Sequence, residues 1–181
     1  MFEGKQTLKG KNLEEEFEME TDKINLLIVD DEEPFLESMK KRLEVRGFAV
    51  TCVNRGDKAI EAARKHPVDI ALVDLKMPGI SGEETLEALK KEHEWMEVVI
   101  LTGHGSVDSA VKCTRGGAYS YLQKPCELDL LLEVLKDAYK KRIMNKMQIQ
   151  EAQMNALLLK ARGDSPLAIL RRLKEMETGA A

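Results

Sequence analysis

The chain has 181 residues, of which 43% are hydrophobic and 33% charged, with a formal net charge of −4 at pH 7. This length suits one domain of ordinary size with extensions, and the three widely spaced cysteines exclude a disulfide framework or a zinc-binding pattern. No apolar run approaches the roughly 20 residues of a membrane span, and the charged start lacks the apolar segment of a signal peptide. We therefore expect a cytoplasmic protein.

Five short apolar runs predict β-strands, and helical patterns lie between them. The first, third and fourth runs are almost continuously apolar, as in strands of a parallel sheet that is covered on both faces. The runs comprise residues 24–29, 48–53, 69–74, 97–102 and 118–122. This strict alternation predicts a doubly wound α/β domain.

Each predicted helix carries an apolar face at helical spacing. The residues of these faces are Phe35, Met39 and Leu43; Ala59, Ile60 and Ala63; Leu86 and Leu89; Val107, Ala110 and Val111; and Leu128, Leu131, Leu132 and Leu135. Pro34 and Ser106 lie where helices are expected to start, and Gly47 and Gly116 lie where they are expected to end.

The fifth helical pattern continues past the predicted domain, because residues 127–162 contain neither Pro nor Gly. Met147, Met154 and Ala161 are seven residues apart, a spacing that is compatible with a long helix that leaves the domain and pairs with a partner helix. An amphipathic helix folded back onto the domain is an open alternative. A further short helix, LAILRRLKEME, is predicted over residues 167–177.

Charge is distributed unevenly along the chain. Residues 1–23 hold four Lys and seven Asp or Glu, whereas residues 139–181 hold nine Lys or Arg and four Asp or Glu. We therefore divide the chain into an acidic N-terminal extension (1–23), a central domain (24–140) and a basic, helical C-terminal extension (141–181).

Ligands bind outside the carboxyl ends of the strands in an open parallel sheet. Asp30-Asp31, Asp74, Thr102 and Lys124 follow four of the five predicted strands. Two carboxylates at about 4 Å repel by on the order of 4 kcal/mol at an effective dielectric of about 20. Mg²⁺, which prefers hard oxygen ligands, removes that repulsion. With a lysine and a hydroxyl placed to hold an anion, the pattern indicates phosphoryl transfer to Asp74.

Taken singly, each of these residues has an ordinary structural explanation. An acidic pair after a strand, or an Asp before a turn, often caps a helix. A threonine is common in loops, and a lysine before proline is usually a surface residue. The prediction depends on their joint occurrence, in order, at the ends of strands 1, 3, 4 and 5.

Four segments around these residues resemble the signature segments of the response-regulator receiver domain, over about residues 24–140. They are VDDEE at 29–33, LVDLKMPGISG at 72–82, LTGHGS at 101–106 and YLQKPC at 121–126. The third segment looks most like receivers of nitrogen-regulatory activators. The resemblance implies a two-component system and a flavodoxin-like, five-stranded parallel sheet of order 2-1-3-4-5 with an extended C-terminal helix.

The resemblance also implies a role for each site residue. Asp74 would accept a phosphoryl group from a sensor histidine kinase, Thr102 would move to hydrogen-bond that group, and Lys124 would pair with it, oriented by a cis bond to Pro125. Tyr121 would swing inward when Thr102 moves, which changes the surface of helix 4, strand 5 and helix 5. Asp31 would bind Mg²⁺ directly, together with Asp74 and the backbone carbonyl of Lys76, and Asp30 would help through water.

The output is not evident from the sequence. No ATPase motif and no convincing helix-turn-helix follows the predicted receiver, so a stand-alone receiver or a truncated regulator is expected. For the C-terminal extension we favour homodimerisation, with docking of a partner protein as an alternative. Contact with nucleic acid is disfavoured because the extension lacks aromatic residues, and no membrane partner is expected.

The main alternative function is a magnesium-dependent phosphohydrolase that uses Asp74 as its nucleophile. Such enzymes carry a second acid two residues after the nucleophile, where this chain has Lys76. A flavodoxin-like cofactor protein is a third possibility, but Asp30-Asp31 would repel its phosphate. We therefore expect self-phosphorylation and self-dephosphorylation only, not turnover of external substrates.

Overall fold

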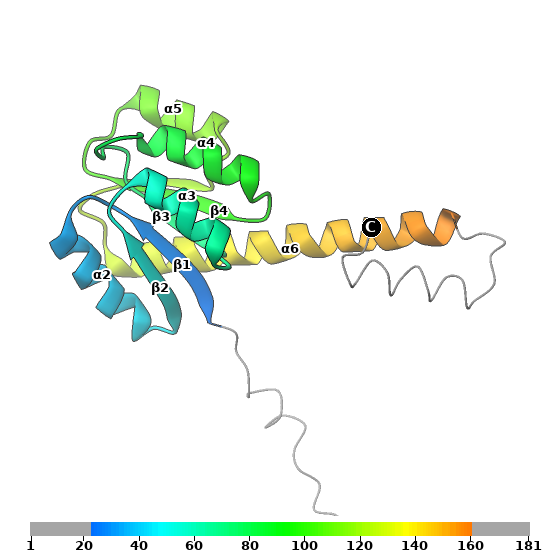
Figure 1. Cartoon of the computed structure of the whole chain (residues 1–181). Coiled ribbons are helices and arrows are strands. Elements are labelled where there is room, and N and C mark those ends of the chain that lie inside the picture. Colours follow the sequence, from blue (N-terminus) through cyan, green and yellow to red (C-terminus); the bar gives the residue numbers. More distant parts are fainter. Residues whose placement is uncertain (1–22, 161–181) are drawn as a thin grey trace, which may run out of the picture.

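The structure is a computed structural model that describes residues 23–160, so the helix predicted over residues 167–177 lies outside the described residues. Five strands alternate with helices, as Figure 1 shows. The strands are β1 (Ile24–Val29), β2 (Phe48–Val53), β3 (Ile70–Val73), β4 (Glu97–Thr102) and β5 (Ser120–Gln123). The helices are α2 (Glu33–Glu44), α3 (Gly56–Lys65), α4 (Gly82–Glu92), α5 (Val107–Arg115) and α6 (Leu128–Lys160).

All neighbouring strands are parallel, and their order is β2-β1-β3-β4-β5. The predicted fold class and strand order are confirmed. Helices α2 and α6 cover one face of the sheet, and α3, α4 and α5 cover the other (Figure 1). Because the strands are parallel, their carboxyl ends lie at one edge of the sheet, which we call the carboxyl edge.

The alternation of side chains along β1 explains why its sequence is apolar throughout. Leu26 and Ile28 pack beneath α2 and α6, whereas Leu27 and Val29 pack beneath α3, α4 and α5. Burial of one such aliphatic side chain contributes about 1.5–3 kcal/mol. The buried residues of β3 and β4 divide between the two faces in the same way, so both helix layers are needed to hold the sheet.

Both predicted helix starts and both predicted helix ends are confirmed, and Gly116 is the C-cap residue of α5. Pro34 lies in the first turn of α2, where its missing N–H costs no helical hydrogen bond. Ser106 caps α5 in a capping box with Ser109. Gly47 follows α2 with φ of +88°, a left-handed conformation that glycine adopts without steric cost.

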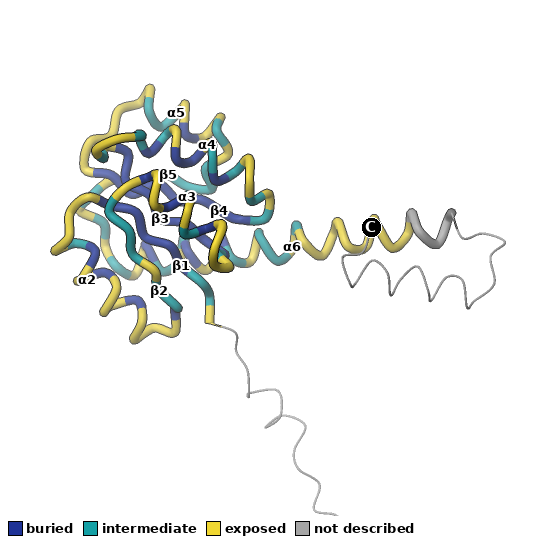
Figure 2. The backbone as a smooth tube through the Cα atoms, viewed as in Figure 1, coloured by how far each residue is buried: buried dark blue, intermediate teal, exposed yellow. Residues whose placement is uncertain are grey.

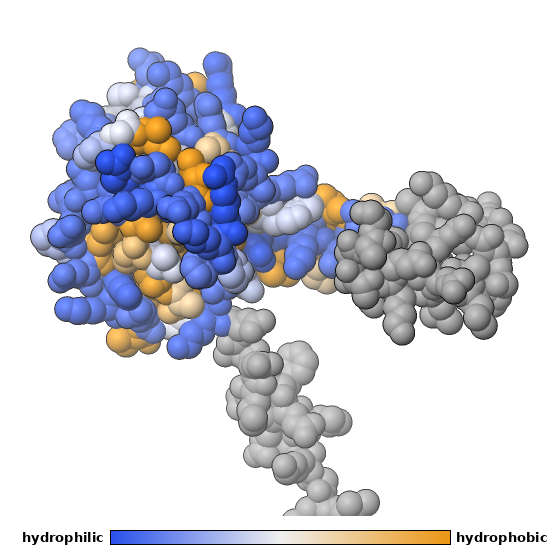
Figure 3. Space-filling view, viewed as in Figure 1, coloured by the Kyte–Doolittle hydropathy of each residue, from blue (hydrophilic) through white to orange (hydrophobic). Residues whose placement is uncertain are grey.

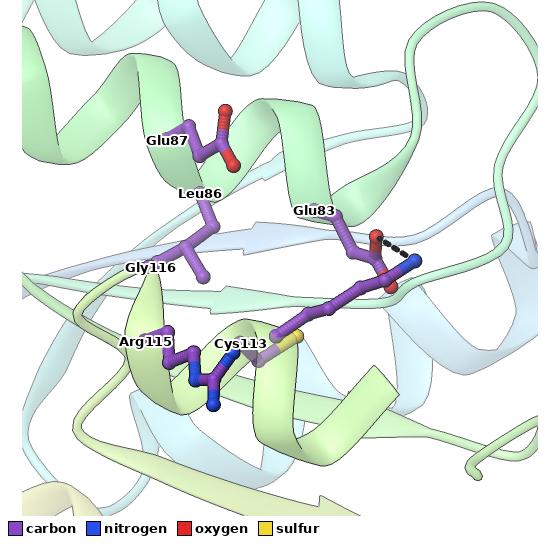
Figure 4. A pocket seen from close by; sticks show the side chains of 7 residues that line it. Glu83, Leu86, Glu87, Cys113, Arg115 and Gly116 are labelled. Atoms are coloured by element: carbon purple, nitrogen blue, oxygen red, sulfur yellow. Dashed lines mark ion pairs between the residues drawn. The ribbon is translucent and has the colours of Figure 1, made fainter. Parts of the chain in front are cut away.

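The predicted apolar face of α5 is wrong. Val107 is 82% exposed and Val111 is 44% exposed, whereas the buried residue of this helix is Cys113. Cys113 and Leu86 line the hollow between α5 and α4, and an ion pair between Glu83 and a lysine of α5 spans it (Figure 4). The small thiol fits this narrow contact between helices, and the valines of the first turns face away from the sheet.

Three smaller expectations also need correction. Leu36, not Phe35, is the buried residue at the start of α2, and Phe35 is half-buried. The third strand spans Ile70–Val73 rather than the predicted 69–74, although the backbone of Asp69 still bonds Asn25 and Glu97 on the neighbouring strands. The fifth strand starts two residues later than the predicted 118–122.

Helix α6 is continuous over Leu128–Lys160 and leaves the body of the domain (Figure 1), so the folded-back alternative is wrong for the described part of the chain. Its buried residues end at Ala138, and residues 146–155 of the projecting part are all exposed (Figure 2). Where it leaves, Arg142 makes an ion pair of 2.8 Å with Asp69, at the start of β3. Within residues 23–160, no helix is both long and apolar enough to cross a membrane.

Candidate functional site

Two buried carboxylates lie on adjacent strands at the carboxyl edge. Asp30 follows β1 and Asp74 follows β3, and the amide of Asp74 donates to the carbonyl of Val29 over 2.9 Å. The amide of Asp30 donates to the carbonyl of Val53, at the end of β2, over 3.2 Å. These backbone bonds continue the sheet by one residue and therefore fix both side chains at the same edge.

Asp31 joins these two residues to form a cluster of three acids. Oxygen atoms of Asp30, Asp31 and Asp74 lie within 4.8 Å of one another. Asp30 and Asp74 are only 2% and 6% exposed, whereas Asp31 is exposed. The sequence prediction that these acids converge is thus met by the geometry.

The hydrogen bonds of the cluster leave one oxygen without a partner. Asp30 Oδ1 accepts from the amide of Glu32 over 3.0 Å, and Asp74 Oδ2 accepts from the amide of Lys76 over 3.2 Å. Asp74 Oδ1 is buried and accepts no hydrogen bond from the described residues. A buried carboxylate oxygen without a partner is costly, because it loses its hydration.

This set of donors fits a Mg²⁺ ion. Mg²⁺ is bound by carboxylate and carbonyl oxygens and keeps several waters, and the exposed Asp31 leaves one side of the cluster open to solvent. A divalent cation there would offset the repulsion among the carboxylates and give Asp74 Oδ1 a partner.

Lys124 contacts the cluster from the loop after β5. Its Nζ lies 2.6 Å from Asp30 Oδ2, 3.2 Å from Glu32 Oε1, and 4.1 Å from the centre of the Phe35 ring. Its amide donates to the carbonyl of Thr102 over 2.9 Å, which ties the loop to the end of β4. The Lys124–Pro125 peptide bond is cis. The lysine predicted to hold an anion thus lies at the cluster, paired with two carboxylates.

The environment of the Lys124–Asp30 ion pair raises the pKa of both residues, which favours the charged form of Lys124 and disfavours the charged form of Asp30. Burial raises the pKa of Asp30, and its hydrogen bond with Lys124 only partly offsets that effect. Burial would lower the pKa of Lys124, but Asp30, Glu32 and Asp74 together raise it. Lys124 keeps its charge because it faces several acids. The charge of Asp30 is disfavoured because Asp30 pairs with one cation only and is repelled by Asp74. The cluster is therefore short of positive charge.

Thr102 bonds the loop before α5 and Tyr121 bonds α5 itself, and neither side chain makes a hydrogen bond to the acids within residues 23–160. Thr102 is fully buried at the end of β4, and its Oγ1 accepts from the amide of His104 over 3.2 Å. Tyr121 is half-buried on β5, and its hydroxyl lies 3.1 Å from Ser109 Oγ.

Three contributors to the site were not singled out from the sequence. Glu32 and Phe35 hold Lys124, and the signal for Glu32 was its place directly after the acidic pair. Gly82, the first residue of α4, lies against Asp74: a Cβ atom there would be 2.1 Å from the backbone oxygen of Asp74. Glycine is therefore required for α4 to start so close to the site.

Comparison with known proteins agrees with this geometry. The sequence matches the family model of the response regulator receiver domain over residues 26–136. The chain belongs to the response regulator receiver family. Its receiver is similar to that of the transcriptional regulatory protein GlrR of Escherichia coli (strain K12), with 33% identity over 114 residues that cover 63% of this chain and 26% of GlrR. The chain thus spans about a quarter of the length of that relative.

Solved receivers have the same fold. A CheY-like receiver domain protein from Methanospirillum hungatei is 30% identical with a TM-score of 0.65, covering 67% of this chain and 97% of that one. The beryllofluoride-activated NtrC4 receiver domain dimer is also 30% identical with a TM-score of 0.62, covering 65% and 98%. The predicted likeness to receivers of nitrogen-regulatory activators is confirmed.

The shortage of positive charge predicts how Asp30→Asn affects stability in EDTA. Because the folded state raises the pKa of Asp30, its contribution to stability is largest below its unfolded pKa and is lost as pH rises through the folded pKa. Asparagine does not ionise, so this variant should have a higher Tm than the wild type at pH 7, by a few degrees, and the gain should shrink toward pH 4. The control is Glu37→Gln, which neutralises an exposed acid outside the cluster and should leave the Tm unchanged. A lower Tm for Asp30→Asn at pH 7 would contradict this electrostatic account.

Proposed function

We propose that this receiver accepts a phosphoryl group on Asp74 from a sensor histidine kinase, in the cytoplasm and with Mg²⁺. The observation that carries the proposal is the convergence of three carboxylates within 4.8 Å at the carboxyl edge, with Lys124 bound to one of them. Asp74 Oδ1 supports the assignment of the nucleophile, because it lies buried with no hydrogen-bond donor among the described residues.

In the proposed reaction, an oxygen of Asp74 forms a bond to phosphorus as the bond from phosphorus to the histidine nitrogen of the kinase breaks. The product is an acyl phosphate, and the histidine recovers a proton from solvent. A Mg²⁺ ion held by Asp30, Asp31, Asp74 and the Lys76 carbonyl would neutralise charge on the phosphoryl oxygens.

Lys124 and Thr102 would stabilise the product. The ammonium group of Lys124 now pairs with Asp30 and Glu32, and a phosphoryl group on Asp74 would offer it a more highly charged partner. The hydroxyl of Thr102 would donate to a second phosphoryl oxygen. These two contacts would couple the chemical state of Asp74 to β4 and β5.

The readout would be the surface formed by α5, β5 and α6, which correspond to helix 4, strand 5 and helix 5 of the resemblance. Val107 and Val111 lie exposed on α5, and Tyr121 lies half-buried on β5. Exposed apolar side chains beside a residue that moves are suited to contact a partner in only one state.

A phosphohydrolase is less well supported. The position two residues after Asp74 is Lys76, an exposed residue whose amide bonds Asp74 Oδ2. A lysine ammonium there does not replace the carboxylic acid that such enzymes use to protonate a leaving group. We therefore propose that only the bound phosphoryl group is hydrolysed.

We also propose that α6 pairs with α6 of a second copy. Met144, Met147 and Met154 lie on the projecting part of α6 and are 60%, 63% and 42% exposed. Apolar atoms lie among hydrophilic ones along this part of the helix (Figure 3). Met147 and Met154 are seven residues apart, the repeat of a two-stranded coiled coil. The NtrC4 receiver, to which this chain is similar, is described as a dimer.

The phosphoacceptor assignment is tested with acetyl phosphate. We expect intact-mass spectrometry to find one added phosphoryl group in the presence of Mg²⁺ and none in EDTA. Asp74→Ala should abolish the adduct, whereas the exposed surface variant Asp108→Asn should retain it. Continuous release of phosphate from many esters, without an adduct on Asp74, would instead support the hydrolase.

The dimer is tested by light scattering after size exclusion. Met147→Glu should weaken self-association at least tenfold because it places a charge in the apolar row, whereas Gln148→Glu, an adjacent exposed position, should not. A wild-type protein that remains monomeric at high concentration would contradict pairing through α6.

A further inference from the structure

We propose that Ser109 is a positioning residue that couples Tyr121 to the first turn of α5, so that release of Tyr121 loosens the start of this helix. The coupling itself follows from hydrogen bonds between β5 and α5. Its control by phosphorylation rests on the proposed function.

The hydroxyl of Ser109 connects two structures. Ser109 Oγ lies 2.9 Å from the amide of Ser106, 2.9 Å from its carbonyl, 3.1 Å from its hydroxyl, and 3.1 Å from the hydroxyl of Tyr121. A hydroxyl has one proton and two lone pairs, so the hydroxyls of Ser106 and Tyr121 share the lone pair that the Ser106 amide leaves. Because a carbonyl oxygen only accepts, Ser109 donates to it, and the Tyr121 hydroxyl donates to Ser109. The capping box of α5 and the tyrosine therefore share one oxygen atom.

Gly105 allows Tyr121 to approach the loop before α5. A Cβ atom at Gly105 would lie 2.5 Å from the tyrosine hydroxyl and 3.3 Å from the ring. The backbone of the loop therefore lies directly against the end of the Tyr121 side chain. Any other residue at position 105 would displace either the loop or the tyrosine.

The other end of the same loop is bonded to Thr102, at the end of β4. Thr102 Oγ1 accepts from the amide of His104, two residues before Ser106. The loop is thus held at one end by the hydroxyl of Thr102 and at the other by the Ser109–Tyr121 pair. If Thr102 turns to a phosphoryl group on Asp74, its lone pairs reorient away from His104, and the loop loses one of its two attachments.

Helix α5 is suited to respond to such a change. It has nine residues, and Cys113, near its end, is its buried residue. Its first turn, with Val107 exposed, is held mainly by the Ser106–Ser109 capping box. A helix start with little buried apolar surface depends on its capping bonds for order.

Amide hydrogen exchange of the full chain, followed by mass spectrometry of peptides covering residues 104–112, tests the coupling. Tyr121→Phe, which removes only the hydroxyl, should speed exchange in the first turn of α5 several-fold. Ser109→Ala should speed it at least as much, and the double variant should be no faster than Ser109→Ala, because both changes remove the same bond. Thr114→Ala, which removes an exposed hydroxyl bonded to Ala110 in the same helix, should leave these amides unchanged.

Two results would overturn the coupling. In the first, the amides of Tyr121→Phe exchange at the wild-type rate. In the second, the rate increases of the two single variants multiply in the double variant. A purely structural role of Ser109 as a cap predicts the second of these results. Comparison of the exchange rates of the double variant and Ser109→Ala therefore distinguishes a positioning role of Ser109 from a role as a helix cap alone.

Control by the site is tested in a second series with beryllofluoride and Mg²⁺. The same amides should exchange faster in the wild type, and Tyr121→Phe should show little further change. Unchanged wild-type exchange, in protein that acetyl phosphate does phosphorylate on Asp74, would overturn this control. If no phosphoryl adduct forms at all, the proposed function fails, and the first series still decides whether Ser109 and Tyr121 are coupled.

Discussion

The shortage of positive charge at the carboxyl edge is the constraint on which the site depends. Three carboxylates lie within 4.8 Å, two of them buried, and Lys124 contacts only part of this charge. Such a cluster is unfavourable unless a cation joins it. In the proposed function the same property would be useful, because a metal ion, a phosphoryl group and the Lys124 ammonium group could exchange partners there.

The hydrophobic layers on both faces of the sheet keep this unfavourable cluster together. Burial of alternate residues of β1, β3 and β4 fixes the parallel strands, and their register brings Asp30 and Asp74 to the same edge. Gly82 then allows α4 to start against the backbone of Asp74. Stability is thus supplied by aliphatic packing distant from the site, while the residues of the site remain poorly compensated.

The sheet and the acids could be predicted because both have local signals: apolar runs for covered strands, and polar residues directly after them. The buried face of α5 could not be predicted, because Val107 and Val111 also have the spacing of a buried face. Only the packing of α5 against α4 selects Cys113 as the buried residue. The pairing of Lys124 with Glu32 and the path of α6, fixed where Arg142 meets Asp69, depend on contacts between distant segments. No local periodicity reports such contacts.

A crystal structure with Mg²⁺ and beryllofluoride tests the central account most directly, because it reports where the lysine ammonium lies once the acids are neutralised. The account predicts a metal ion bound by Asp31 and Asp74, and Lys124 Nζ moved from Asp30 to a fluoride on Asp74. Lys124 still paired with Asp30 and Glu32, next to a fully formed beryllofluoride adduct, would contradict it.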